Sequence, residues 1–251
     1  MRVIEGLSHV TIAAPDIEAA WADYEHLLQT SPVRWRDAFV FATGNVGVML
    51  RASMPGEAAG LRSLTFRTAD LGTARQGLAR CGLPSAESDE TGESAFDASA
   101  TSGLPIALTS RALPHAAVSQ LSLDHIVIRT PNPERAIALY GGRLGLDMRL
   151  DRSNPAWNAR LMFFRCGDTT VEIAHVLSGG VSDASDTFGG LSWRVPDIEA
   201  EHARLASEEF EMSPVRTGRR PGSKVCTVRT RTADVPTILL GVTPRESTSS
   251  K

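Results

Sequence analysis

Two histidines stand at equivalent places in two similar stretches of the sequence. The residues one and three positions after His9 and after His125 are apolar. Because successive side chains of a strand face opposite ways, these apolar residues turn to one side and each histidine turns to the other. Glu172 alternates with apolar neighbours in a later strand-like run and points inward by the same argument. Imidazole and carboxylate together suit Mn, Fe(II), Zn or Ni. We therefore predict a metal or catalytic centre at His125 and Glu172, with Glu172 as a ligand or a base.

Arginines recur near the ends of these strands. Counting four residues onward from the equivalent position of each repeat gives an arginine in three of four repeats, among them Arg129 and Arg194. A planar guanidinium binds a carboxylate or phosphate through two hydrogen bonds, so we predict that both bind substrate. The alternative is that they cap strand ends or pair with loop acids. Trp157 is expected either to line the mouth of a pocket or to pack in the core. The basic segment 218–224 lacks the spacing of a phosphate-binding loop and is interpreted as a turn at the cavity rim.

The elements that position these residues repeat along the chain. Four segments share a short β-type run, then Pro or Ala with Asp or Asn, then an amphipathic helix. They are residues 7–16, 61–70, 123–132 and 189–197. Short strand-like runs follow each helix, so each unit of about 60 residues predicts the order β-α-β-β-β. The helix after residue 70 is the weakest prediction, because Gly72 and Gly77 interrupt it.

The four units fall into two halves. We predict an N-terminal domain at residues 1–112, a C-terminal domain at 122–243 and a linker at 113–121. Residues 244–251 are expected to form a frayed tail. The predicted fold class is α+β, with four βαβββ modules paired into two curved sheets.

Composition narrows the class of protein. Of 251 residues, 42% are hydrophobic and 22% are charged, which disfavours a disordered or coiled-coil chain. The formal net charge of −3 gives no reason to expect a nucleic-acid partner. No apolar run approaches the ~20 residues of a membrane span, and no signal peptide is recognisable, so we expect a cytoplasmic protein without a membrane partner. The three cysteines, Cys81, Cys166 and Cys226, lie far apart in the sequence and are expected as reduced thiols.

The openings of the first and third units, residues 9–16 and 125–132, and the stretch 136–146 resemble the vicinal oxygen chelate superfamily. That group includes glyoxalase I, bleomycin- and fosfomycin-resistance proteins and type I extradiol dioxygenases. The resemblance covers residues 5–243. It implies glyoxalase-like domains, in which two units form a curved sheet around a cavity, with metal ligands on the first and last strands of each unit. The corresponding first-strand positions are His9, Ser63, His125 and Gly190, and the last-strand positions are Val48 or Met49, a residue near Ala107, Glu172 and Ile238.

The ligand set departs from the family pattern. If the units pair in sequence order, the C-terminal cavity holds His125 and Glu172, and the N-terminal cavity holds only His9. A pairing of the first unit with the third, or a pairing across two chains, would instead gather all three as metal ligands. His9 is otherwise expected as a hydrogen-bonded residue that lines a pocket. A separation of His125 and Glu172 above about 6 Å would exclude a shared metal.

The resemblance implies a divalent-metal enzyme that acts on a small oxygenated metabolite. A lyase or isomerase is favoured over a ring-cleaving dioxygenase, because Gly190 stands where a second histidine is expected. The alternative is a metal-free protein of the same fold that binds or sequesters a small molecule, as antibiotic-resistance proteins do. A further alternative is that the N-terminal half serves only as a scaffold or dimer surface. The expected partner is a small molecule, and a homodimer is left open.

Overall fold

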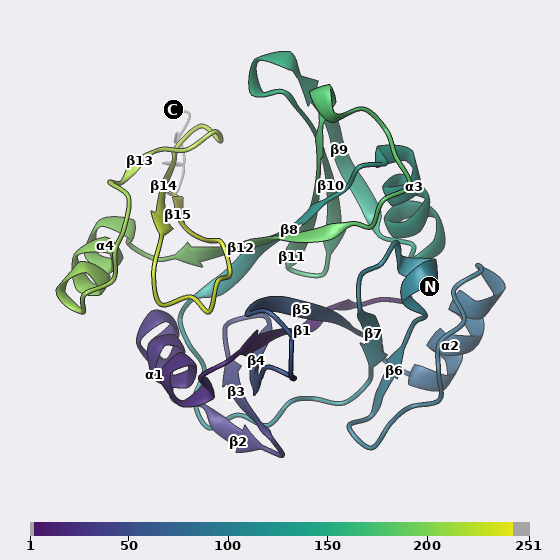
Figure 1. The fold of residues 1–251 in the computed structure, drawn as a ribbon, viewed down its shortest axis with the longest axis horizontal. Coiled ribbons are helices and arrows are strands. Elements are labelled where there is room, and N and C mark those ends of the chain that lie inside the picture. Colours follow the sequence, from purple (N-terminus) through teal and green to yellow (C-terminus); the bar gives the residue numbers. More distant parts are fainter. Residues whose placement is uncertain (1–2, 243–251) are drawn as a thin grey trace, which may run out of the picture.

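The computed structural model describes residues 3–242 and contains two β-sheets, one from each half of the chain (Figure 1). The first sheet has the strand order β2-β3-β4-β1-β5-β7-β6, and the second has the order β13-β14-β15-β12-β8-β11-β10-β9. The first sheet consists of β1 (Gly6–Ala14), β2 (Val33–Trp35), β3 (Ala38–Ala42), β4 (Gly47–Ala52), β5 (Gly60–Arg67), β6 (Glu93–Ala95) and β7 (Ile106–Thr109). The second consists of β8 (Ser122–Arg129), β9 (Asp147–Asn154), β10 (Ala159–Cys166), β11 (Thr169–Val176), β12 (Thr187–Val195), β13 (Arg216–Thr217), β14 (Ser223–Val228) and β15 (Thr237–Val242). The predicted fold class is confirmed. The predicted tail at 244–251 lies outside the described residues.

The helices begin where the repeated Pro-Asp signal predicts. They are α1 (Ile17–Leu28), α2 (Leu71–Arg80), α3 (Pro133–Ile137) and α4 (Ile198–Ser207), and a π-helix at Ala138–Arg143 continues α3. The side chain before each helix, Asp16, Asp70, Asn132 or Asp197, accepts a hydrogen bond from a backbone N–H of the first turn. Such N-caps contribute about 1 kcal/mol each, and α2 forms despite its glycines.

The second unit departs from the predicted strand count. Between α2 and β6 the described chain makes a single bridge, Ser85 to Phe96, in place of a strand. The cause is local, because the Asp89 carboxylate accepts hydrogen bonds from the N–H groups of Thr91 and Glu93. Turns of this kind compete with strand pairing.

The units pair in sequence order within one chain. Strand β1 runs antiparallel to β5, and β8 runs antiparallel to β12, so the first unit joins the second and the third joins the fourth. In Figure 1 the outer strands of each sheet bend away from the other sheet, so the convex faces meet and the concave faces point in opposite directions. The candidate site residues of the two halves, His9 in the first and His125 with Glu172 in the second, therefore lie on separate concave faces.

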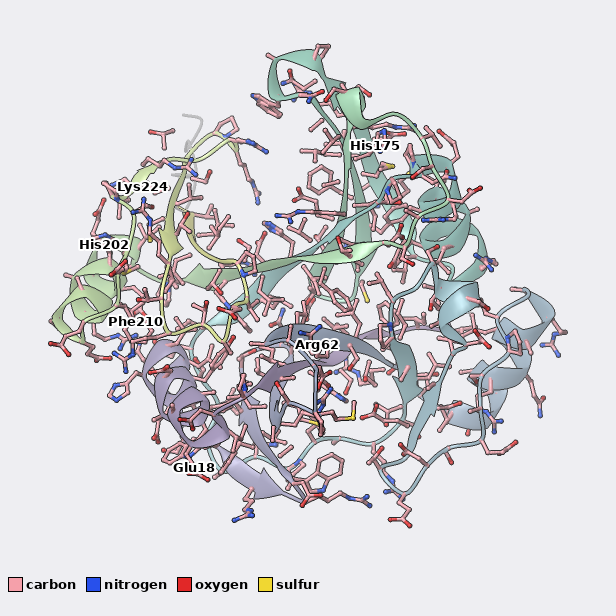
Figure 2. The ribbon with its side chains drawn as sticks, viewed as in Figure 1. Glu18, Arg62, His175, His202, Phe210 and Lys224 are labelled. Carbon is pink, nitrogen blue, oxygen red and sulfur yellow. The ribbon has the colours of Figure 1, made fainter. Side chains whose placement is uncertain are left out.

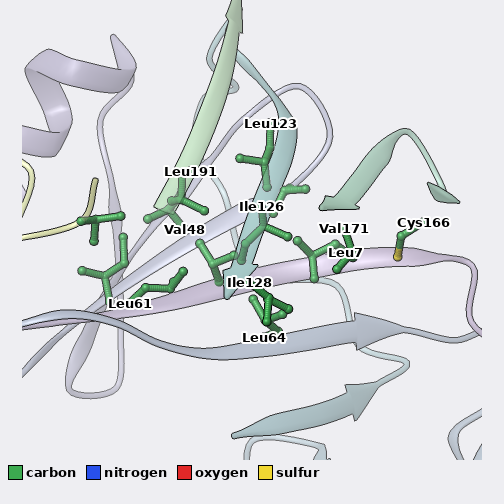
Figure 3. Packing of buried hydrophobic residues seen from close by; sticks show 14 of the residues in the cluster. Leu7, Val48, Leu61, Leu64, Leu123, Ile126, Ile128, Cys166, Val171 and Leu191 are labelled. Carbon is green, nitrogen blue, oxygen red and sulfur yellow. The ribbon is translucent and has the colours of Figure 1, made fainter. Parts of the chain in front are cut away.

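The convex faces share one apolar core. Figure 3 shows Val48 and Leu64 of the first sheet close to Ile126, Ile128 and Leu191 of the second, and all five are at most 2% exposed. Burying side chains of this size contributes about 1.5–3 kcal/mol each. The two sheets are thereby held in a fixed relation.

The segment between the sheets lies against the first sheet. Ala42 of β3 forms a bridge with Val118, and the Gly44 N–H donates to the Leu121 carbonyl. Leu113 reaches the concave side close to Gly47. We retain the division into domains 1–112 and 122–243 with the linker 113–121 as a proposal. No helix among residues 3–242 has the length and apolarity needed to cross a membrane.

Candidate functional site

The concave face of the second sheet brings His125 and Glu172 together. His125 lies on β8 and Glu172 on the parallel neighbour β11, where Thr170 pairs with His125 and Glu172 pairs with Val127. This register turns both side chains to one face. His125 Nε2 lies 3.5 Å from Glu172 Oε2, well inside the limit set for a shared metal. The two groups are therefore close enough to act on one ligand.

Asp124 joins this pair through a β-bulge. Opposite β12, the pairing passes from His125–Ser192 to Leu123–Trp193 and leaves Asp124 as an extra residue. The bulge brings the Asp124 carboxylate to 2.9 Å from His125 Nδ1. The sequence analysis missed Asp124, because strict alternation places it on the opposite face from His125. An adjacent Asp-His pair at the start of a strand was the only available signal.

Burial and charge set the protonation of the two carboxylates. Burial raises the pKa of Glu172, and the Asp124 charge adds to this effect, while His125 and Arg219 oppose it. Burial acts in the same direction on Asp124, but its bonds to His125 and Arg194 outweigh burial and lower its pKa. Arg194 donates to Asp124 Oδ1 from Nε at 3.1 Å and from a terminal nitrogen at 2.9 Å. The environment thus favours the ionised form of Asp124 and the protonated form of Glu172.

His9 occupies the other concave face, and the structure does not bring it together with His125 and Glu172. It is 1% exposed, and its Nε2 lies 3.0 Å from Glu93 Oε1 on β6. Thr65 donates to the other Glu93 oxygen at 3.2 Å. The pair joins β1, at the centre of the first sheet, to β6 at its edge.

The three predicted substrate-binding residues have different surroundings. The Arg194 guanidinium forms an ion pair with Asp124. This agrees with the second role expected for it, which is pairing with an acidic side chain and not with substrate. Arg129 is exposed at the end of β8, four residues or about 13 Å along the strand from His125. Trp157 is 41% exposed and stands beside Arg152 and Arg219, so it does not belong to the core.

Other histidines lie away from this cluster. His175 on β11 is buried, and its Nδ1 lies 3.0 Å from the Thr130 carbonyl. His202 on α4 contacts the Ser213 carbonyl. Figure 2 shows His175 toward α3 and His202 beside α4 at the edge of the molecule.

Two cavities of about 740 and 680 Å³ lie along the seam between the halves. The larger is lined by residues of α1 and by 228–236, and the smaller by residues of both sheets. Neither is lined by His125 or Glu172. Their charged side chains are largely engaged in pairs, such as Arg51 with Glu57. We therefore place the candidate site on the concave face, where acid and base groups converge.

Comparison with known proteins identifies a related family for part of the C-terminal half. Residues 124–227, which include Asp124, His125 and Glu172, match the family model for the glyoxalase/bleomycin resistance protein/dioxygenase superfamily. Over these residues the chain resembles that superfamily, in agreement with the motifs of the third unit. The match covers the C-terminal half, and the N-terminal half shares the superfamily's fold. No curated protein sequence matches the chain.

Solved structures of the superfamily fold extend over nearly the whole chain. A mutant 4-hydroxymandelate synthase from Streptomyces coelicolor is 12% identical, with a TM-score of 0.72, and covers 95% of this chain and 92% of its own. BphC, a halotolerant catechol dioxygenase, is 12% identical with a TM-score of 0.73 and coverages of 96% and 88%. An Mn(II)-bound glyoxalase from Novosphingobium aromaticivorans is 14% identical with a TM-score of 0.71 and coverages of 96% and 83%. At these identities the likeness shows the fold alone.

The vicinal oxygen chelate pattern offers four ligand positions on this face, and only two carry donor side chains. The other two are Gly190 and Ile238, which the strand pairing places at matching points of β12 and β15. A Cβ atom on Gly190 would lie 2.2 Å from the Pro236 carbonyl oxygen, and the residue has φ +135°. Residues 3–242 contain no cluster of three His, Cys, Asp or Glu side chains that could hold a metal. The donor set therefore falls short of the three protein ligands usual for a resident catalytic metal.

Proposed function

We propose that this protein is an enzyme that moves a proton on a small oxygenated anion, as an isomerase or lyase rather than a ring-cleaving dioxygenase. The observation that carries the proposal is the row Asp124–His125–Glu172. One imidazole has a carboxylate at 2.9 Å from Nδ1 and a second, buried carboxylate at 3.5 Å from Nε2. Paired titratable groups with opposite pKa shifts are typical of acid–base centres.

The geometry supports a separate role for each group. Glu172 takes a proton from the carbon next to a carbonyl or carboxylate of the substrate, because burial favours its protonated form. His125 Nε2 faces the same space as Glu172 and is the donor for the substrate oxygen that gains negative charge. Asp124 accepts from Nδ1 and fixes the ring, and Arg194 holds Asp124 in place. Return of the proton from Glu172 to the adjacent carbon, together with transfer of the hydroxyl proton between the two substrate oxygens through His125 Nε2, completes the isomerisation of a hydroxy-carbonyl compound.

A metal-dependent reaction at the same pair is the second candidate. The 3.5 Å separation and the hold of Asp124 on Nδ1 favour it, because neighbouring ligands of one ion are spaced in this way. The number of donors opposes it, since Gly190 and Ile238 supply none. We derive no step of the reaction through a metal.

Hydrogen exchange tests the proposal. Pyruvate and 2-oxobutanoate are incubated in D₂O with chelator-dialysed protein, and loss of their C–H signals is followed by NMR. We expect exchange above the buffer rate, lowered at least about hundredfold in Glu172→Gln. Glu199→Gln serves as the matched control, since Glu199 lies on α4 and pairs with Lys224. Activity that needs added Mn²⁺ or Zn²⁺ would favour the metal-dependent candidate. Binding of these acids without any exchange would favour a sequestering protein.

A further inference from the structure

Trp157 and Arg219 meet across the mouth of the second sheet. Trp157 follows β9, the strand at one edge, and Arg219 lies between β13 and β14 at the opposite edge. The Arg219 guanidinium carbon nevertheless lies 4.5 Å from the centre of the Trp157 ring. The sheet therefore curls until its two edges come into contact, and the strands of His125 and Glu172 lie in the middle of that curl.

A second arginine shares the same ring. The guanidinium carbon of Arg152, on β9, lies 5.7 Å from the centre of Trp157. Within residues 3–242, neither Arg152 nor Arg219 makes a side-chain hydrogen bond or an ion pair. Arg160 of the neighbouring strand β10, by contrast, binds both Asp151 and Glu134. Two cations thus stand at one ring, and neither is held in an ion pair among the described residues.

This arrangement leaves hydrogen-bond donors available. Contact with an aromatic ring occupies the face of a guanidinium, while its N–H groups lie in the plane and remain free. Because both guanidiniums contact the same ring, an anion that accepts from their free N–H groups would also reduce the repulsion between the two positive charges. Arg219 also acts electrostatically on Glu172, so its charge is felt at the acid–base centre. An anion held by these arginines would extend toward Glu172.

We propose that Arg152, Trp157 and Arg219 form an anion clamp that binds the carboxylate or phosphate of the substrate at the rim of the C-terminal concave face. The clamp deepens the proposed function, on which it rests for the chemistry at Glu172. It assigns substrate recognition to Arg219 and Arg152, whereas Arg194 is occupied by Asp124. The substrate class is a small compound that carries an anionic group beside its reacting carbon.

Calorimetric titration with defined probes tests the clamp. The probes are oxalate, inorganic phosphate and catechol, which represent a carboxylate, a phosphate and a neutral compound with adjacent oxygens. We expect wild-type protein to bind at least one of the two anions. Arg219→Gln and Arg152→Gln should each weaken that anion about tenfold or more, as loss of a charged hydrogen bond does. Tighter oxalate than phosphate identifies a carboxylate, and the reverse identifies a phosphate.

Matched variants separate the clamp from general charge. Arg220→Gln removes the same charge one residue away, at another exposed position, and should change the affinity by less than about twofold. Trp157→Phe should keep most of the affinity, while Trp157→Leu should lose about two- to fivefold. Equal effects of Arg219→Gln and Arg220→Gln would overturn the proposal, and so would failure of both anions to bind.

The two proposals fail in different ways. If Arg219→Gln weakens the anion but Glu172→Gln retains hydrogen exchange, the clamp stands and the proposed acid–base reaction falls. If Glu172→Gln abolishes exchange but Arg219→Gln binds the anion as wild type does, the reaction stands and the clamp falls.

Discussion

Gly190 explains why the fourth unit supplies no ligand, and its replacement tests that explanation. A Cβ atom at this position would lie 2.2 Å from the Pro236 carbonyl oxygen and 2.9 Å from Pro236 Cβ. The φ angle of +135° is unfavourable for any residue with a side chain. Gly190→Ala therefore introduces backbone strain and a collision with another backbone segment.

The two effects can be separated with glycines that carry fewer constraints. Gly180 has φ +67° but open space around its Cβ position, so Gly180→Ala should cost about 1–2 kcal/mol from backbone strain alone. Gly142 has open space and no positive φ, so Gly142→Ala should change stability by less than about 1 kcal/mol. Gly190→Ala adds an overpacking cost of about 1–3 kcal/mol, for a total of about 2–5 kcal/mol. At about 2–4 °C per kcal/mol, Tm should fall by about 10 °C.

Urea unfolding followed by circular dichroism measures the three variants on one scale. We expect the free energy of unfolding to decrease in the order Gly142→Ala, Gly180→Ala, Gly190→Ala, with the last clearly separated. If Gly190→Ala matches Gly180→Ala within about 0.5 kcal/mol, the Pro236 carbonyl moves aside easily. In that case the backbone does not exclude a side chain at this position, and the steric argument against a fourth-unit ligand is refuted.

Three further predictions concern the carboxylates. Asp124→Asn should lower the hydrogen-exchange rate about 10- to 100-fold, because the His125 imidazole loses the acceptor that orients it. Substrate binding should change little. An unchanged exchange rate would contradict the orienting role of Asp124. Burial raises the pKa of Glu172 in the folded chain, so above about pH 4.3 the Glu172 carboxyl binds more proton in the folded state than in the unfolded state, and its own contribution to the unfolding free energy should decrease as pH rises through that window. The advantage of Glu172→Gln over wild type in urea unfolding should therefore widen with pH, and a constant difference would be evidence against the shift. Asp70→Ala should cost about 1 kcal/mol in the same assay, because α2 loses the acceptor of the Thr73 N–H.

Much of the fold was predictable because its signals are local. Asp16 and Asp197 follow the repeated prolines and cap α1 and α4, so the repeat marks helix starts directly. The alternation around Glu172 gave its direction correctly, since β11 is regular. The lost strand near Ser85 was not predictable from the repeat, because a side-chain-stabilised turn replaced it.

The candidate site was less predictable because it depends on irregular and long-range features. Asp124 reaches His125 only through the bulge in β8, and no periodic pattern reports a bulge. Arg219 meets Trp157 across opposite edges of a curved sheet, and the sequence places them 62 positions apart with no spacing rule between them. In the sequence, Gly190 stands where a metal ligand is expected. The structure shows in addition that a side chain at this position would collide with Pro236.

The central claim is that small anions are bound and processed at Asp124, His125 and Glu172 without a metal held by the protein. Its most direct test is a crystal structure grown with oxalate and Mn²⁺, with anomalous data collected at the manganese edge. The account predicts oxalate between Glu172 and Arg219, and no manganese peak within about 2.2 Å of His125 Nε2. A manganese peak shared by His125 and Glu172, or oxalate bound only in the seam between the halves, would contradict it.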